Sequence, residues 1–132
     1  MINPRSYKKI KYFQSKLLRE NNFMHAFFTK RHKKNIPIEL QKELNLNSNI
    51  HFIKQVHGNK VIQINNTLLL KSETGDCLIT NERNQSLWIY TADCIPILIA
   101  DKETRNIAAC HCGLKGLKTQ IISKTLKKLI EI

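Results

Sequence analysis

The uninterrupted apolar runs of this 132-residue chain are short, and the longest of them is Ile95–Ala100. A transmembrane helix needs about 20 apolar residues, so no membrane-spanning helix and no membrane partner are expected. Short apolar runs bounded by turn residues are instead typical of buried strands. The pattern therefore predicts a globular, strand-rich domain.

Alternation and turn residues predict strands at residues 23–29, 51–57, 77–80, 87–90, 95–100 and 107–110. The Gly58-Asn59 pair is a tight-turn signal, which would make residues 51–64 a hairpin. Helical spacing predicts a short helix over residues 36–46 and a longer helix from Leu117 onward. The expected fold class is α/β (α+β), with a mixed β-sheet flanked by helices.

The N-terminal residues are basic with scattered apolar positions. Residues 5–20 fit either an amphipathic helix or an extended segment, and their spacing does not decide between the two. We expect a single partial domain over residues 1–132, with residues 1–22 as a basic N-terminal extension.

The net charge of +12 raises the question of nucleic-acid binding. The basic residues fall into three separate clusters, and the sequence has no zinc-finger spacing and no RNA-binding aromatic signature. Lys, Ile and Asn are abundant together, and their codons are A/T-rich. Solvated lysines therefore explain the charge, and no nucleic-acid partner is expected.

The chain has four cysteines, which are too few for a disulfide-stapled secreted scaffold of this length. The first residues hold no apolar signal core, so a cytoplasmic location is expected. In a reducing compartment, cysteines and histidines that cluster more often bind metal or take part in chemistry.

Three such residues stand at predicted strand ends: His57 beside a turn, Cys94 between two strands, and His111 before a glycine turn. Side chains from several strands can converge at such an edge. Strand alternation turns Cys110 away from His111, so the Cys-His-Cys string is not a three-ligand clamp. Cys110 is expected to be a buried packing residue, and the direction of Cys112 stays open.

Four motifs follow one another in order: Lys54-Gln-Val-His-Gly58, Gly75-Asp-Cys-Leu-Ile-Thr80, Thr91-Ala-Asp-Cys94 followed by Ile-Pro-Ile-Leu, and His111-Cys-Gly-Leu-Lys-Gly116. Together with Phe27-Phe-Thr-Lys-Arg31, they resemble the signatures of the YfiH-like laccase-domain family. Its members carry the names multicopper polyphenol oxidase and purine nucleoside phosphorylase. The resemblance covers roughly residues 23–130.

The resemblance implies the family's α/β fold and a metal site of His57, Cys94 and His111 that binds Zn²⁺, with copper as the alternative. It implies a zinc-dependent purine nucleoside phosphorylase acting on adenosine, inosine, guanosine or methylthioadenosine with phosphate, and adenosine deaminase as a further activity. The alternatives are a catalytically impaired metal-binding remnant and a copper-dependent polyphenol oxidoreductase. The expected partners are a purine nucleoside and phosphate.

The chemistry suits these residues. Three protein ligands leave the fourth position of zinc for water or substrate, and zinc lowers the pKa of bound water to about 7. Cys94 and His111 are expected to be catalytic. Asp93 fits either an acid-base role or a turn hydrogen bond. Arg31 and Lys115 are expected to hold phosphate.

Asp76 is expected to cap the Gly75 turn.

The last motif departs from the family pattern, which usually reads His-Ala-Gly-Trp-Arg-Gly. Leu114 and Lys115 stand in the places of Trp and Arg, and lysine cannot replace the bidentate fork of arginine. Family members also continue past the helix that follows His111. We therefore expect a C-terminally truncated member, either a fragment or a shortened gene product. If the chain is the whole product, we expect it to bind one zinc and to have weak phosphorolytic activity.

Overall fold

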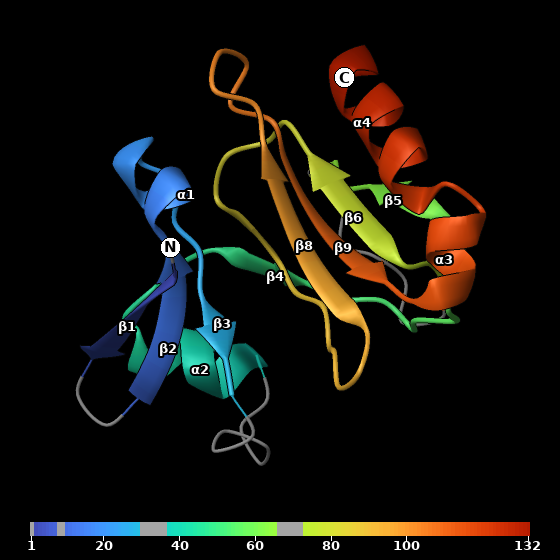
Figure 1. Ribbon diagram of the computed structural model, residues 1–132. Helices are drawn as coiled ribbons and strands as arrows, with labels where there is room; N and C mark the ends of the chain where they lie inside the picture. The colour runs from blue at the N-terminus through green and yellow to red at the C-terminus, as the bar shows by residue number, and fades with distance from the viewer. Residues whose placement is uncertain (1, 8–9, 30–36, 66–72) are drawn as a thin grey trace. The chain divides into compact units, whose positions relative to one another are not determined.

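The structure is a computed structural model that describes residues 2–7, 10–29, 37–65 and 73–132 (Figure 1). Residues 1–47 and residues 48–132 form two compact units. The prediction of one domain with an extension at residues 1–22 stays a prediction. Within the described ranges, no helix has the length and apolar character needed to cross a bilayer.

The first unit contains a small antiparallel sheet in the order β1-β2-β3. Its elements are β1 (Ile2–Tyr7), β2 (Ile10–Ser15), α1 (Lys16–Glu20), β3 (Phe27–Phe28) and α2 (Pro37–Glu43). Residues 5–20 thus combine strand and helix, because the Ser15 hydroxyl accepts from the Leu18 amide and starts α1. The predicted strand at residues 23–29 is reduced to β3, and the predicted helix over residues 36–46 is confirmed within the described residues as α2.

The second unit is built on a four-stranded sheet in the order β5-β6-β9-β8. Its strands are β5 (Val61–Gln63), β6 (Cys77–Thr80), β8 (Ile95–Ala100) and β9 (Ile107–Cys112). The β5–β6 pair is parallel, whereas β9 pairs antiparallel with both β6 and β8. The sheet is therefore mixed, as predicted. A separate parallel pair joins β4 (Asn49–His51) to β7 (Gln85–Leu87).

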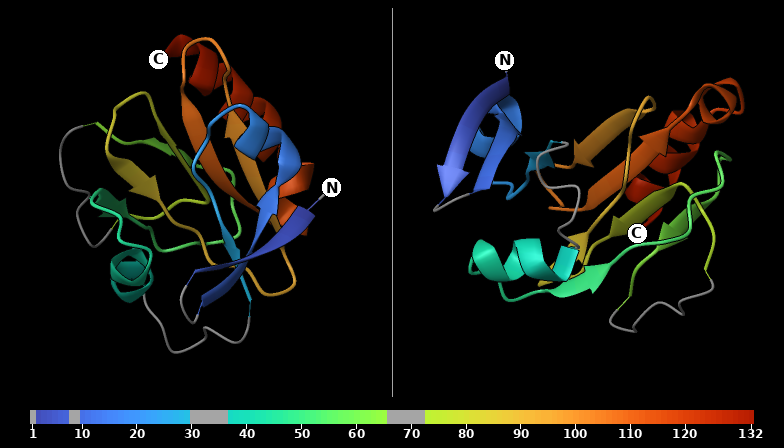
Figure 2. Two further views of the ribbon diagram at one scale, coloured as in Figure 1. Left: turned by 90° about the vertical axis from the view of Figure 1, so that its left-hand side faces the viewer. Right: turned by 90° about the horizontal axis from the view of Figure 1, so that it is seen from below.

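Two helices follow β9 and complete the second unit. These are α3 (Leu114–Lys118) and α4 (Ile121–Glu131), and α4 packs on β9, β6 and β5 (Figures 1 and 2). The core between sheet and helix contains Val61, Cys77, Ile79, Ala108, Cys110, Cys112, Ile121 and Leu129. Leu78 belongs to a second buried cluster, with Ile53 and Ile64. Successive residues of β6 thus serve two clusters, as strand alternation requires.

Three sequence predictions about this unit are wrong. Residues 51–64 do not form a hairpin, because β4 pairs with β7 and β5 pairs in parallel with β6. The predicted strand at residues 51–57 ends at His51, because the amides of residues 56–58 donate to the side chain of Asp76. The predicted strand at residues 87–90 lies earlier, at Gln85–Leu87.

The side chain of Leu78 is fully buried in β6, so Leu78→Ala should leave a cavity and lower the free energy of unfolding by about 2–5 kcal/mol. Leu114 is 71% exposed and supplies the matched control. Leu114→Ala should change the free energy of unfolding by less than about 1 kcal/mol. Urea denaturation followed by circular dichroism measures both, and equal losses would contradict the described core.

Candidate metal centre

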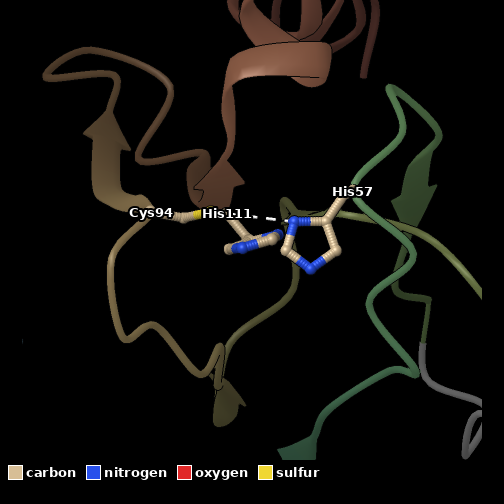
Figure 3. A group of neighbouring side chains, drawn as sticks. All are labelled: His57, Cys94 and His111. Atoms are coloured by element: carbon tan, nitrogen blue, oxygen red, sulfur yellow. Dashed lines mark hydrogen bonds between the residues drawn. The ribbon is translucent and has the colours of Figure 1, made fainter.

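His57, Cys94 and His111 lie together, although they come from three separate segments (Figure 3). One ligand atom from each residue lies within 4.8 Å of the other two. The Cys94 Sγ is 3.7 Å from the Nδ1 of His57. The two imidazole rings are arranged edge to face, with centroids 4.8 Å apart. The structure thus brings together the three residues that the motifs indicated.

His57 is positioned by a turn rather than by a strand. Its backbone is left-handed, with φ of 56°, which is uncommon for a residue with a side chain. The amides of Val56, His57 and Gly58 all donate to the carboxylate of Asp76. Successive amides that turn toward one anion form a nest, and this nest explains the strained turn.

His111 belongs to β9 and is buried, with 3% of its surface exposed. Its Nδ1 lies 2.9 Å from the Oδ1 of Asp76, which is itself fully buried. The backbone amide of His111 also donates to the carbonyl of Asp76. Asp76, which directly precedes β6, therefore holds His111 through both its backbone and its side chain.

Cys94 lies directly before β8, at the end of the segment that starts after β7. That segment is tied to the His57 segment by Gln55, whose amide group forms two hydrogen bonds with the backbone of Tyr90. The side chain donates to the Tyr90 carbonyl at 2.7 Å and accepts from the Tyr90 amide at 2.7 Å. Gln55 thus takes the place of a backbone pairing between the two segments, beyond the end of β7 at Leu87.

Two glycines of the last motif are required by close approaches. A Cβ on Gly113 would lie 3.0 Å from the Cys94 Sγ and 3.3 Å from the His57 Nδ1. A Cβ on Gly116 would lie 2.8 Å from the carbonyl oxygen of Gly58, a distance that real structures do not allow. Gly113 therefore keeps the space between two candidate ligands free, and Gly116 lets α3 approach the His57 turn.

The cluster lies at a pocket of about 340 Å³. Its lining residues are Gln55, His57, Tyr90, Thr91, Ala92, Asp93, Cys94 and His111. Partial burial raises the pKa of Tyr90, so its phenol stays neutral at physiological pH. A small molecule that enters this pocket would contact the three clustered side chains directly.

The donor set fits zinc. A tetrahedral zinc with Zn–S of about 2.3 Å and Zn–N of about 2.0–2.1 Å separates its sulfur and nitrogen ligands by roughly 3.5 Å. The Cys94 Sγ and His57 Nδ1 are already 3.7 Å apart. Within the described residues, this is the one group of three or more such side chains that could hold a metal ion.

The other predicted site residues do not belong to the cluster of His57, Cys94 and His111. Asp93 is exposed and lines the pocket, whereas Lys115 is exposed on α3 and is not a lining residue. Arg31 lies outside the described residues. The expectation that Asp76 caps the Gly75 turn is wrong, because its carboxylate binds His111 and the His57 turn. The sequence patterns also did not identify Gln55 as a residue that supports the site. Asp76 and Gln55 are both far along the chain from the residues that they bind, so no local spacing reveals these contacts.

The two neighbours of His111 in the Cys-His-Cys string point to the core. Cys110 is fully buried and Cys112 is 3% exposed, and both pack in the cluster beneath α4. The prediction that Cys110 is a buried packing residue is confirmed. Cys112, which the sequence left open, shares its face because β9 continues through it.

The fold and the clustered side chains define an α+β protein with a candidate metal centre of one cysteine and two histidines. Residues 29–132 match the family model described as multi-copper polyphenol oxidoreductase laccase. The crystal structure of a Neisseria meningitidis protein superposes with a TM-score of 0.63 at 18% identity, covering 97% of this chain and 57% of that protein. It supports the fold alone.

Relatives named purine nucleoside phosphorylase include proteins of Rickettsia conorii, Synechocystis and Aquifex aeolicus. The Rickettsia conorii protein is 30% identical over 136 residues, which cover 99% of this chain and 54% of the relative. The Synechocystis protein is 33% identical over 114 residues, which cover 82% of this chain and 43% of the relative. The Aquifex aeolicus protein is 44% identical over 77 residues, which cover 58% of this chain and 36% of the relative.

The chain belongs to the multi-copper polyphenol oxidoreductase laccase family. Membership confirms the resemblance that the ordered motifs indicated. The chain spans about half of the length of these relatives or less.

The four cysteines should differ in reactivity. Cys94 lies at the pocket, whereas Cys77, Cys110 and Cys112 are buried. A hydrogen bond with Cys110 and burial raise the pKa of Cys77, and burial raises that of Cys112, which suppresses their thiolates. Native metal-free protein treated with a thiol reagent should therefore be labelled first at Cys94, as read by mass spectrometry of peptides.

Cys94→Ser is the matched control for this labelling experiment, because it should remove the fast phase and leave the slow phase unchanged. Fast labelling at Cys110 would contradict the assignment of its side chain to the core.

Proposed function

We propose that His57, Cys94 and His111 hold one zinc ion, and that the pocket beside them supports phosphorolysis of purine nucleosides. The observation that carries this proposal is the convergence of one thiol and two imidazoles from three segments. Relatives named purine nucleoside phosphorylase support the choice of reaction.

Zinc is favoured over copper by the number and kind of ligands. One sulfur and two nitrogens suit a tetrahedral zinc with one open position, although such soft ligands also bind copper. Multicopper oxidase chemistry needs several metal sites, whereas the described residues offer one group of three ligands. The family description still makes copper the second candidate, and metal analysis distinguishes the two.

In phosphorolysis, phosphate displaces the purine base from the anomeric carbon of ribose. A zinc ion held at this centre would supply Lewis acidity at its open position. Asp93 lies at the pocket and is proposed to accept or donate a proton. Lys115 and Arg31 are proposed to neutralise phosphate, Lys115 as a point charge from the first turn of α3.

Two residues support a weaker enzyme as the alternative. Leu114 and Lys115 stand where the family usually has Trp and Arg, so a stacking surface and a bidentate anion clamp are absent at these positions. We propose that the 132-residue chain binds zinc and has a lower kcat/KM for inosine than a longer relative. Adenosine deamination is proposed as a further activity of the same centre.

The first test concerns the metal. Zinc titrated into metal-free protein should bind at one ion per chain, as measured by calorimetry and elemental analysis. Gly113→Ala should weaken this binding at least tenfold, because its methyl group would press on Cys94 and His57. In Gly58→Ala the new Cβ would stay 3.5 Å from its nearest neighbour, so this control should bind zinc nearly as the unchanged protein does.

Equal zinc affinity in both glycine variants would contradict the proposed position of the ion. Oxidation of a phenol substrate in air by copper-loaded protein, with no phosphorolysis by zinc-loaded protein, would favour copper as the metal instead.

The second test concerns the reaction. Metal-loaded protein, supplied with inosine and phosphate, should release hypoxanthine with a lower kcat/KM than the Synechocystis relative measured beside it. Lys115→Arg should lower the KM for phosphate several-fold, because a guanidinium forms two parallel hydrogen bonds with the anion. Lys118→Arg, also on α3, is the matched control and should leave the KM unchanged.

Phosphate affinity measured by calorimetry gives a second readout for the same variants. Equal kcat/KM values for the chain and the relative would show that Leu114 and Lys115 do not limit the reaction. Identical effects of the two arginine substitutions would remove Lys115 from the phosphate site. Adenosine supplied without phosphate tests deamination through the appearance of inosine.

A further inference from the structure

Asp76 has a side chain that is fully buried, and a buried carboxylate must be compensated by hydrogen bonds or charge. Its Oδ1 accepts from the amides of Val56 at 3.2 Å and His57 at 2.8 Å, and its Oδ2 accepts from the Gly58 amide at 2.7 Å. The Val56 amide also reaches Oδ2, at 3.4 Å. Both oxygens thus accept from backbone N–H groups, and an ionised carboxylate has no proton of its own to donate.

This carboxylate determines the tautomer of His111. The Nδ1 of His111 lies 2.9 Å from Oδ1, and an acceptor-only partner requires that this nitrogen carries the proton. In the neutral ring, Nε2 then has the free lone pair. His111 can therefore offer only Nε2 to a metal.

The same carboxylate determines the direction of His57. The three amides that it binds belong to consecutive residues, and this requires the left-handed backbone of His57. In that turn, the His57 Nδ1 faces the Cys94 Sγ at 3.7 Å (Figure 3). A Cβ on Gly113 would lie 3.3 Å from the His57 Nδ1 and 3.0 Å from the Cys94 Sγ, so this nitrogen and the sulfur approach the same point.

We propose that Asp76 is the positioning residue of the metal centre, and that it makes the two histidines present opposite ring nitrogens, Nδ1 of His57 and Nε2 of His111. Asp76 does not touch the ion itself. It holds one ligand through the proton on Nδ1 and the other through the amides of its turn. The inference deepens the proposed zinc site, on which it rests.

Second-sphere carboxylates of this kind fix ring orientation and raise ligand basicity, and their loss typically lowers metal affinity 10–100-fold. A single carboxylate that orients two ligands from different segments should be at the upper end of this range. The geometry also explains why Asp76 stands directly before β6, since this strand pairs with β9, which carries His111.

The first experiment uses the unchanged protein without metal. Two-dimensional ¹⁵N–¹H correlation of the imidazoles, assigned through bonds, reports which ring nitrogen carries the proton. The pH is raised in steps until each ring is neutral. His111 should carry its proton on Nδ1 and His57 on Nε2. A proton on Nε2 of His111 would overturn the proposal, and this result does not depend on metal binding or on any variant.

The second experiment compares Asp76→Asn with Asp101→Asn. In Asp76→Asn the amide NH₂ must face an N–H group on whichever side it lies, because both oxygens of Asp76 accept from amides. Asp101 is the matched control, since its Oδ1 accepts from the amides of Glu103 and Thr104, and it is not a pocket residue.

Co²⁺ serves as the spectroscopic probe, because its thiolate charge-transfer band and visible bands report sulfur ligation and geometry. Asp76→Asn should bind Co²⁺ about 100-fold more weakly, with altered visible bands and a shifted His111 tautomer. Asp101→Asn should match the unchanged protein. A folded Asp76→Asn variant with unchanged affinity and spectrum would reduce Asp76 to a purely structural role.

If Asp76→Asn does not fold, the tautomers of the unchanged protein decide the question alone. The absence of zinc and cobalt binding in the unchanged protein would contradict the proposed function. The predicted tautomers would still be measurable in that case, so the two failures are distinguishable.

Discussion

The site depends on one buried carboxylate. Asp76 binds the amides of the His57 turn and the imidazole of His111, and it lies directly before β6 in the middle of the sheet. Removing its side chain would take the acceptor from three partly buried backbone N–H groups and from the buried Nδ1 of His111 at once, at about 1–3 kcal/mol for each group left unsatisfied. The stability of this region and the arrangement of the candidate ligands therefore have the same physical origin.

Residues on the two faces of β9 have different roles. Cys110 and Cys112 face α4 and serve as small core side chains, whereas His111 points to the opposite face and reaches Asp76. A string of three potential ligands therefore supplies one ligand, because a strand alternates its side chains. The other two come from irregular segments, which Gln55 ties together through the backbone of Tyr90.

Short-range information predicted a substantial part of the fold. Strands β6 and β8 have the predicted bounds, and α2 lies within its predicted range, because their apolar patterns are set by burial of the element itself. The helix predicted from Leu117 onward begins only at Ile121, because α3 ends at Lys118 and Gln120 is left-handed. The hairpin prediction at residues 51–64 was wrong because strand pairing is not set by local sequence. A turn signal specifies a change of direction, but it does not specify which strand the returning segment pairs with, and here that strand is β6.

The sequence by itself determined the strand-rich α+β class, the family, and the three residues His57, Cys94 and His111, because each stands in a motif that can be read locally. Only the tertiary structure decided what holds them. Asp76 is 19 residues from His57 and 35 residues from His111 along the chain, so no periodicity joins them. Parallel and antiparallel pairing around β6 brings them within hydrogen-bond distance, and the need to compensate a buried charge then sets their geometry.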